Sequence, residues 1–589
     1  MFKIVNKINS SKDVQKLNPT ELNLLADETR SLIINKLTKQ AGHCGSNLGI
    51  IEATIALHYV FDFEKDKIVF DVSHQCYPHK ILTGRKNAWL NENEFNSISG
   101  YSNPDESDYD VFKVGHTSTS ISLVTGLAKA RDLNHKNHNI VAVIGDGSLS
   151  GGQSFEGLNN ASLLNSQLLI VVNDNDMSIS DNVGGLYKNL KQLRITKGKY
   201  ENNYFKTFGF EYLFVENGNN IQDLISAFSK AKQIKKPIIV HICTQKGKGL
   251  EWAENNKEAW HWSVPFDKET GTSKKSNPEG IMNYTALTRE FLRDKAKTKK
   301  DFVVITPAVP VGCGFTPDFR AELDERYIDV GIAEPHAISF ASGLAKAGIK
   351  PIVGLNSSFV QRTYDQLLQD VGLNNLPVLV LLYKSGIAPM DPTHIGLFDT
   401  SMASSIPNVV CMSPSKEDYL SALNWAIEQN DYPIIMRVPF ESSEEPLSLN
   451  FQLQSFEPFK SKILKSGEQI AIFAVQKTLH IAQKLSNAIK SALGVESTIV
   501  DAIYTNGLDT SLAKNLAKNH SIFVSLEDGL LEGGFGEKLA STLSYTNCKV
   551  LSFGAKKEFF DKTPLSQLYD KFGMNAEMIL KTIKDLIQK

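Results

Sequence analysis

The chain has 589 residues, 42% of them hydrophobic, and a formal net charge of −2. Its length predicts about three domains with buried cores, and its composition is that of an ordinary globular protein. The near-neutral charge argues against a generally basic surface, so we expect small-molecule substrates as partners and neither nucleic acid nor a membrane.

The cysteines and the N-terminal segment bear on the cellular compartment. The six cysteines are scattered and include no CxxC pair, which is typical of free thiols in a reducing compartment. Residues 1–15 contain no apolar signal-peptide core, and no apolar run reaches membrane-spanning length. We therefore expect a cytoplasmic protein.

Three histidine-bearing loops follow one another in the first part of the chain. A capped helix is predicted over residues 22–37, and His43 lies in the small-residue loop after it. His74 follows a short apolar strand, and His116 precedes another helix. One such histidine is more often structural than catalytic. Together they indicate a ligand site, because loops at the strand ends of an α/β sheet converge.

The stretch 140–180 predicts a strand, a turn, a helix and a second strand. The first strand ends in Gly145-Asp146-Gly147, and the second ends in Asn173-Asp174-Asn175. By the crossover rule both strand ends lie at one edge of a parallel sheet, which brings Asp146 and Asn175 together. Carboxylate and amide oxygens suit Mg²⁺, and the glycines allow backbone N–H groups to approach phosphate. A metal–diphosphate site is favoured over the alternative, a plain strand-end turn.

A second α/β unit is predicted after a polar linker over 268–278. Its strand over 327–332 runs into Glu334, which lies between apolar residues where an unpaired carboxylate is costly. Glu334 fits either a helix cap or a functional acid. A buried strand over 377–382 is followed by a polar turn that contains Asp391 and His394, which can position or protonate a carbonyl.

The third unit, from about residue 469, again alternates strands with helices. It shows neither a metal-ligand cluster nor a basic stripe, so we expect it to serve packing and dimer contact. The predicted fold is α/β with three doubly wound parallel-sheet domains. The predicted domains are a diphosphate- and Mg²⁺-binding domain over 1–280, a pyrimidine-binding domain over 281–450 and a C-terminal domain over 465–589.

Several motifs, in order along nearly the whole chain, resemble one family. They are HCGSNLG, FDVSHQCYPHKILTGR, VGHTSTSIS, the GDG and FEGLN pair, NDNDMSIS, DVGIAEPHA and SLEDGLLEGGFGEKLAS. Together they resemble the 1-deoxy-D-xylulose-5-phosphate synthase family of the transketolase superfamily. The resemblance implies a transferase that uses thiamine diphosphate and Mg²⁺ to join pyruvate to glyceraldehyde 3-phosphate, with release of CO₂. It also implies a homodimer and a role in isoprenoid and thiamine biosynthesis.

The resemblance also implies roles for individual residues. The metal ligands would be Asp146, Asn175 and the carbonyl of Met177. Contacts to the cofactor would come from His74, Gly115, His116, Thr117, Gly147, Ser148, Asn175, Phe359 and Glu334, with Glu334 bonded to the aminopyrimidine and Phe359 stacked on it. The catalytic residues would be Glu334, His43, His394, Asp391 and His261. The substrate would contact Arg362. Lys384 and Arg437 are candidates for holding its phosphate in an arrangement that differs from the family's.

The acceptor-phosphate pocket departs from the family pattern. Asn356 stands where the family has Tyr, Lys384 where it has Arg, and Phe440 where it has the second Arg of its last motif. The Asp391–His394 turn is one residue shorter, with Pro392 in place of a Gly. Loss of one charge-assisted contact costs about 1.5–3 kcal/mol, and a lysine does not reproduce the bidentate grip of an arginine on phosphate.

Two alternatives to the family's reaction therefore stay open. One is a diverged enzyme that transfers an acetyl or ketol unit to a different aldehyde or sugar acceptor. The other is a non-catalytic scaffold, against which Asp146, Asn175 and Glu334 argue. A further open question is whether the polar segment 89–110 closes over the substrate as a lid.

Overall fold

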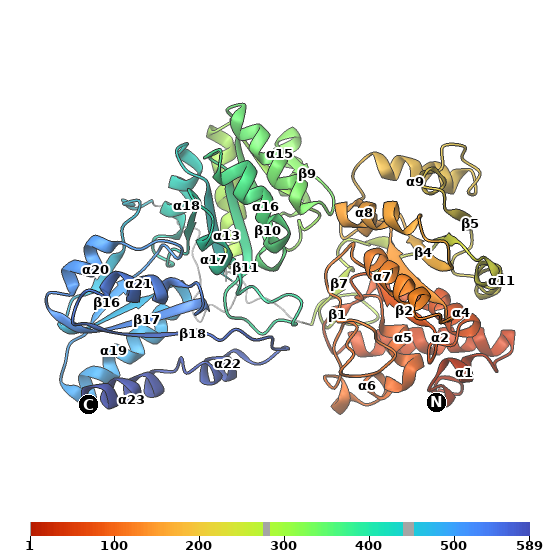
Figure 1. The fold of residues 1–589 in the computed structure, drawn as a ribbon, viewed down its shortest axis with the longest axis horizontal. Coiled ribbons are helices and arrows are strands. Elements are labelled where there is room, and N and C mark those ends of the chain that lie inside the picture. Colours follow the sequence, from red (N-terminus) through yellow and green to blue (C-terminus); the bar gives the residue numbers. More distant parts are fainter. Residues whose placement is uncertain (1, 275–282, 440–452, 589) are drawn as a thin grey trace. The chain divides into compact units, whose positions relative to one another are not determined.

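The computed structural model describes residues 2–274, 283–439 and 453–588 (Figure 1). The chain forms two compact units: the first comprises Met1–Asn277 with Gly331–Ala333, and the second comprises Pro278–Val330 with Glu334–Lys589. The expected domain boundaries after residues 280 and 450 lie outside the described residues, so the three-domain division stays a prediction. None of the described helices has both the length and the apolar character that a membrane crossing requires.

The first unit contains a five-stranded sheet with the order β2-β3-β4-β6-β5. All of its strand pairs are parallel. Its strands are β2 (Lys67–Phe70), β3 (Ile140–Gly145), β4 (Leu168–Asp174), β5 (Glu211–Val215) and β6 (Pro237–Cys243). Its main helices are α2 (Pro19–Leu37), α4 (Ile51–Val60), α7 (Ser120–Leu133), α8 (Gly152–Ala161), α9 (Gly185–Ile195) and α11 (Ile221–Gln233).

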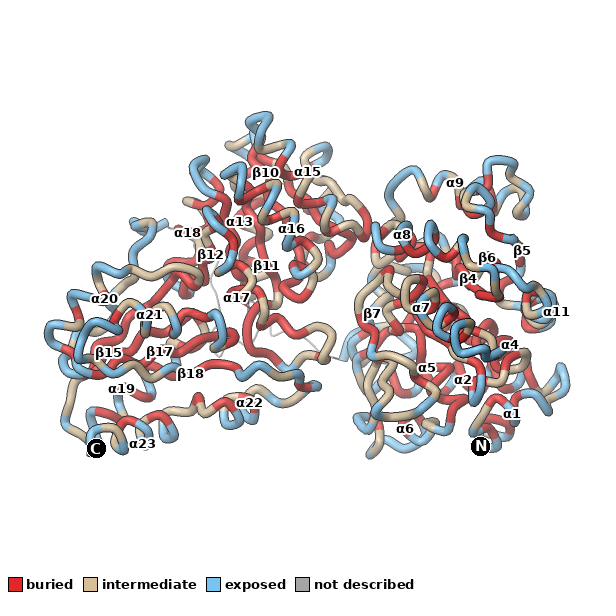
Figure 2. Tube along the Cα trace, in the orientation of Figure 1, coloured by how far each residue is buried: buried red, intermediate tan, exposed pale blue. Residues whose placement is uncertain are grey.

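Helices cover both faces of this sheet, because its strands are apolar on both sides. Val141 and Val143 of β3 pack in one core cluster, which also holds residues of α4 and α11. Ile140 and Ala142 belong to a second cluster, which also holds residues of α7 and α8. The strands lie in the buried part of the molecule shown in Figure 2. Only the loops at the strand ends are therefore available to hold a ligand.

The second unit contains a six-stranded sheet and a five-stranded sheet. The first has the order β12-β13-β11-β10-β8-β9, and all of its strand pairs are parallel. Its strands are β8 (Phe302–Thr306), β9 (Tyr327–Asp329), β10 (Lys350–Asn356), β11 (Leu379–Ser385), β12 (Val410–Met412) and β13 (Ile434–Pro439). The helices packed with it include α13 (Tyr284–Thr298), α15 (Glu334–Lys346), α17 (Asp399–Ser404) and α18 (Tyr419–Glu428).

The other sheet of the second unit has the order β14-β16-β15-β17-β18. Its strands are β14 (Lys462–Lys465), β15 (Gln469–Ala474), β16 (Thr498–Asp501), β17 (His520–Leu530) and β18 (Lys549–Ala555), and its main helices are α19 (Leu479–Leu493), α21 (Phe535–Leu543) and α23 (Ala576–Ile587). The edge strand β14 is antiparallel to β16, and the remaining pairs are parallel. The predicted α/β class with parallel sheets is confirmed, and the antiparallel edge strand was not predicted.

Candidate functional site

The predicted metal ligands lie at the carboxyl edge of the first sheet. Asp146 directly follows β3 and Asn175 directly follows β4, and these two strands are neighbours in parallel register. The Asp146 side chain is 1% exposed and its Oδ2 accepts hydrogen bonds from Met177 N at 3.1 Å and Asn182 Nδ2 at 2.7 Å. Asn175 Oδ1 is buried and has no hydrogen-bond partner in the described part of the chain. An acceptor oxygen left in this state fits a cation ligand.

The charge around Asp146 also fits a cation. Burial raises the pKa of Asp146 to about 7, and the neighbouring Asp174 carboxylate adds to the shift. Lys246, which follows β6 at the same edge, is 2% exposed and donates from Nζ to Ser178 O at 2.5 Å. Burial lowers the pKa of Lys246 to about 8. A buried carboxylate and a buried ammonium group thus face a site that suits a metal ion with an anion.

Lys246 was not predicted as a site residue. The available signal was its position directly after a strand that ends at the same sheet edge as β3 and β4.

Two loops that were predicted to contact the cofactor pack directly against each other. Ser118, next after Gly115-His116-Thr117, donates from Oγ to Ser148 O at 2.7 Å. Its backbone N donates to Asp71 Oδ1 at 2.8 Å, which fixes the loop ahead of α7. A Cβ on Gly147 would approach Ser178 to 3.0 Å, so a side chain at this position would be crowded. These contacts hold backbone groups of both loops near Asp146.

The structure gathers three of the predicted histidines in the first unit. The short strands β1 (Gly42–His43) and β7 (Trp262–Ser263) pair antiparallel, which places His43 near His261. The ring centroid of His43 lies 5.1 Å from that of His74 and 5.6 Å from that of His261. The ring centroids of His74 and His261 are 5.4 Å apart. His116 lies half-buried in the loop ahead of α7.

Two of the clustered histidines, His74 and His261, are held neutral. Burial lowers the pKa of His74 to about 3 and that of His261 well below its usual value, with nearby Lys246 contributing to both. The Nδ1 atoms of these two rings are buried and lack a hydrogen-bond partner among the described residues. Neutral rings with open nitrogen atoms can exchange protons with a bound substrate or hydrogen-bond to it.

The second unit holds the remaining predicted site residues. Glu334 is the first residue of α15 and is 4% exposed, and Arg362 Nη1 lies 3.4 Å from its Oε2. Phe359 packs edge-on against His394, with ring centroids 5.6 Å apart. Asp391 Oδ1 lies 3.3 Å from Lys562 Nζ. The unit thus brings a buried carboxylate near an arginine, and an aromatic ring near a histidine.

The guanidinium group of Arg437, which was predicted to contact the substrate, is buried and bonded within the second unit. Its side chain is 1% exposed, and Nε donates to Asp399 Oδ2 at 2.9 Å. Nη1 donates to Ser413 Oγ at 3.3 Å and Nη2 donates to Asp528 O at 2.8 Å. Arg437 lies on the interior strand β13, and its partners are distant in sequence, so the motif alone did not indicate its burial.

The other altered positions of the expected acceptor pocket have different environments. Lys384 is half-buried near the end of β11 and has a positive φ of 58°. Asn356, the last residue of β10, is 7% exposed, and its Oδ1 finds no hydrogen-bond partner within residues 2–274, 283–439 and 453–588. Phe440 lies outside the described residues.

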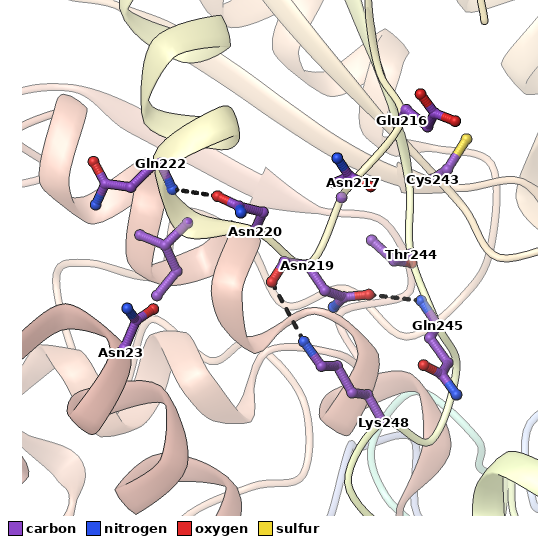
Figure 3. Close-up of a pocket in the computed structure, with 12 residues that line it drawn as sticks. Asn23, Glu216, Asn217, Asn219, Asn220, Gln222, Cys243, Thr244, Gln245 and Lys248 are labelled. Atoms are coloured by element: carbon purple, nitrogen blue, oxygen red, sulfur yellow. Dashed lines mark hydrogen bonds between the residues drawn. The ribbon is translucent and has the colours of Figure 1, made fainter. Parts of the chain in front are cut away.

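A separate polar pocket of about 620 Å³ lies in the first unit (Figure 3). It is lined by residues that follow β5 and β6 and by the start of α11. Asn219 Oδ1 accepts from Gln245 N at 2.8 Å, and Asn220 Oδ1 accepts from Gln222 N at 3.0 Å. No residue predicted for the site lines this pocket, and these lining groups bond to one another.

Asp174, His241 and Cys243 are close enough to suggest a further metal site. However, Asp174 accepts hydrogen bonds from Arg194 Nη1 at 2.7 and 2.8 Å, and its Oδ2 lies 2.9 Å from His241 Nε2. The other ring nitrogen of His241 lies 2.8 Å from Tyr212 Oη. Asp174 and His241 are therefore satisfied by hydrogen bonds, and this network holds the end of β4, next to Asn175.

Comparison with known proteins identifies the family. Residues 5–203 and 194–244 match the family model of 1-deoxy-D-xylulose-5-phosphate synthase. The 1-deoxy-D-xylulose-5-phosphate synthase of Syntrophomonas wolfei is 36% identical, over 99% of this chain and 97% of its own length. The chain belongs to this family. It is therefore an enzyme of the transketolase type.

Further matches extend along the whole chain. Residues 281–443 match the pyrimidine-binding domain of transketolase, and residues 460–579 match the transketolase C-terminal domain. The synthase of Carboxydothermus hydrogenoformans is 36% identical over the full length of both chains, and that of Clostridium acetobutylicum is 36% identical over 99% of each. Among solved structures, the transketolase of Campylobacter jejuni aligns with 97% of this chain and 100% of its own, at 16% identity and a TM-score of 0.44.

Proposed function

We propose that this chain condenses pyruvate with glyceraldehyde 3-phosphate, with loss of CO₂, to give 1-deoxy-D-xylulose 5-phosphate, and that it requires thiamine diphosphate and Mg²⁺. The full-length identity to synthases with this name supports the reaction and favours it over transfer to another acceptor. The observation that carries the cofactor requirement is the pairing of the buried Asp146 carboxylate with the unpartnered Oδ1 of Asn175 at neighbouring strand ends.

The residues of the first unit fit the metal–diphosphate part of the cofactor. Asp146, Asn175 and the Met177 carbonyl would hold Mg²⁺, and Lys246 would balance the diphosphate charge. Backbone N–H groups around Gly147 would approach the phosphates, because glycine has no side chain to stand between its backbone and a ligand. The remaining proposed contacts are those of Gly115, His116, Thr117, Ser148 and His74.

The residues of the second unit fit the aminopyrimidine part. Glu334 would accept or share a proton with the ring, and its burial makes that hydrogen bond strong. Phe359 would stack on the ring. When bound, thiamine diphosphate supplies the electron-accepting group that makes decarboxylation of a 2-keto acid possible.

The other proposed residues act on the substrates. His43 and His261 would orient the substrate carbonyl and exchange protons through their ring nitrogens. Asp391 and His394 would position the aldehyde acceptor. Arg362 and Lys384 stay as candidates for its phosphate, whereas Arg437 does not. We further propose that the active form is a cytoplasmic homodimer that serves isoprenoid and thiamine biosynthesis.

The proposed function is tested by cofactor-dependent product formation. The purified protein is incubated with pyruvate and glyceraldehyde 3-phosphate, with and without thiamine diphosphate and Mg²⁺, and the sugar product is identified by NMR. We expect 1-deoxy-D-xylulose 5-phosphate only when both cofactors are present, and none from Asp146→Ala. Product formation that needs neither cofactor would contradict the proposal.

A further inference from the structure

The loop over residues 386–396 in the second unit carries two residues of the proposed acceptor site, Asp391 and His394. It leaves β11 at Gly386 and leads toward α17. Gly386 N donates to Gly396 O at 2.9 Å, and this contact closes the base of the loop. The positions of Asp391 and His394 therefore depend on what holds this base.

The start of the loop is held by two charged residues of the C-terminal part of the chain. Asp528, on β17, accepts at Oδ1 from Ile387 N at 2.8 Å. Lys477, just ahead of α19, donates from Nζ to Ile387 O at 3.0 Å and lies 3.5 Å from Asp528 Oδ2. The backbone N–H and the backbone carbonyl of Ile387 are thus both bound by one ion pair from the C-terminal part of the chain.

The fit at this point is close. Gly386 has a φ of 90°, and a Cβ at this position would lie 2.0 Å from Asp528 Oδ2. The carboxylate therefore occupies the space that any side chain at residue 386 would need. The loop and Asp528 are shaped for each other, so this contact is specific rather than a chance surface approach.

The end of the loop connects to the backbone carbonyl of Asp528 through a buried chain of contacts. Ser357 Oγ lies 3.3 Å from Gly396 O and 2.9 Å from Asp399 Oδ2. Asp399 accepts from Arg437 Nε, and Arg437 Nη2 donates to Asp528 O at 2.8 Å. Two carboxylates and two cations thus tie both ends of the loop into one network.

The middle of the loop is also bound by the C-terminal part of the chain. Lys562 N donates to Met390 O at 2.9 Å, and Lys562 Nζ lies 3.3 Å from Asp391 Oδ1. The loop therefore contacts the C-terminal sheet or the segment after it at its start and its middle.

We propose that Asp528 and Lys477 are positioning residues that set the loop carrying Asp391 and His394 for the acceptor step. Buried ion pairs seldom raise stability over well-packed apolar residues, but breaking one partner disturbs the geometry that they fix. The C-terminal domain then does more than pack and form dimer contacts, because it holds part of the substrate site. The expected effect on acceptor kinetics rests on the proposed function. The expected effect on the position of the loop rests on the geometry alone.

The test replaces Lys477 by Met, which keeps the length of the side chain and removes the ammonium group. Lys465→Met is the matched control, because Lys465, on β14 of the C-terminal sheet, pairs with Glu496 and Ser486 and lies outside the network. The first readout is hydrogen exchange of residues 386–396 in the cofactor-free protein, which does not depend on the reaction. We expect exchange at least about tenfold faster in Lys477→Met, and wild-type exchange in the control.

The second readout distinguishes an effect on the acceptor step from an effect on the pyruvate step. In Lys477→Met we expect the KM for glyceraldehyde 3-phosphate to rise about tenfold, while CO₂ release from pyruvate without acceptor changes less than about twofold. Lys477→Arg should restore much of the loss. Should Lys477→Met not fold, Asp528→Asn provides the same two readouts, because its amide keeps one oxygen for Ile387 N.

Several results would overturn the inference. Unchanged loop exchange, or equally faster exchange in Lys465→Met, would show that the network does not hold the loop. Faster exchange with an unchanged acceptor KM would show that the loop's position does not matter for this step. If the wild type made no product at all, the proposed function would fail while the exchange result still stood.

Discussion

Asp146 couples the stability of the cofactor-free protein to pH. Its pKa is raised to about 7, mainly by burial, whereas an unfolded aspartate titrates near 4. Between these values the folded form binds the proton and the unfolded form does not, so the free energy of unfolding falls as pH rises through this window. The cost of the buried charge is complete above about pH 7.

We predict that Asp146→Asn stabilises the cofactor-free protein at pH 8 and has little effect at pH 4. An asparagine oxygen can still accept from Met177 N and Asn182 Nδ2, while the charge is removed. The gain at pH 8 should be on the order of 2–4 kcal/mol, measured by urea unfolding at both pH values. Equal differences at the two pH values would contradict this assignment.

Metal binding should also depend on the protonation state of Asp146. A carboxylate ligand must lose its proton before it binds a cation. We therefore predict that Mg²⁺-dependent binding of thiamine diphosphate weakens about tenfold for each pH unit below about 7 and levels off above it. Titration calorimetry between pH 5.5 and 8.5 measures this. Affinity that does not change across this range would show that Asp146 is not the ligand that titrates.

Arg437 and Lys384 should respond differently to the same substitution. Arg437→Met leaves Asp399 buried without its partner, so we predict a loss of about 3–5 kcal/mol in unfolding free energy. Lys384→Met, at a half-buried position, should leave stability within about 1 kcal/mol and raise the KM for the phosphorylated aldehyde. Urea unfolding with acceptor kinetics on both variants separates these effects. A stable Arg437→Met with an altered acceptor KM would restore Arg437 as a substrate residue.

The segment over residues 89–110 is tied down at several points, which bears on whether it closes as a lid. Lys36 Nζ donates to Phe95 O at 2.8 Å, and Lys80 Nζ donates to Glu106 Oε2 at 2.6 Å. Arg85 holds Asp110 through two hydrogen bonds of 2.8 and 2.9 Å. A segment held by such contacts resists local opening.

We predict that residues 96–110 exchange slowly with or without cofactor, and that Arg85→Met makes their exchange at least about tenfold faster. Removing Arg85 breaks the bidentate contact and leaves Asp110 buried. Hydrogen exchange with peptide resolution measures this. Fast exchange in the cofactor-free wild type that slows on cofactor addition would instead indicate a lid.

Structural features that depend on residues close together in the sequence could be predicted from it. The helix start at Asn18 is an example, because the side chains of Asn18 and Glu21 each accept a hydrogen bond from the backbone N–H of the other residue, within one turn. The Asp146 and Asn175 strand ends were also predictable, since the crossover rule fixes their common edge. Pairing of β1 with β7 was not, because its partners are about 220 residues apart and no local pattern specifies it. The burial of Arg437 could not be predicted for the same reason, because its partners are distant in sequence.

At the scale of the whole molecule, each compact unit holds one part of the expected machinery. The first holds Asp146, Asn175 and the histidine cluster, and the second holds Glu334, Phe359 and the acceptor-side loop. All three family models match in the order expected of the family. Asn356 and Lys384 belong to the proposed acceptor pocket, so we expect the cofactor and pyruvate steps to match those of the family.

The most direct measurement is a competition between two aldehydes. The protein is supplied with thiamine diphosphate, Mg²⁺ and pyruvate, and kcat/KM is compared for glyceraldehyde 3-phosphate and unphosphorylated glyceraldehyde, with products identified by NMR. We predict 1-deoxy-D-xylulose 5-phosphate as the main product and a preference of at least about tenfold for the phosphorylated aldehyde. Faster turnover of unphosphorylated glyceraldehyde would contradict the proposed acceptor and show a site rebuilt for another substrate.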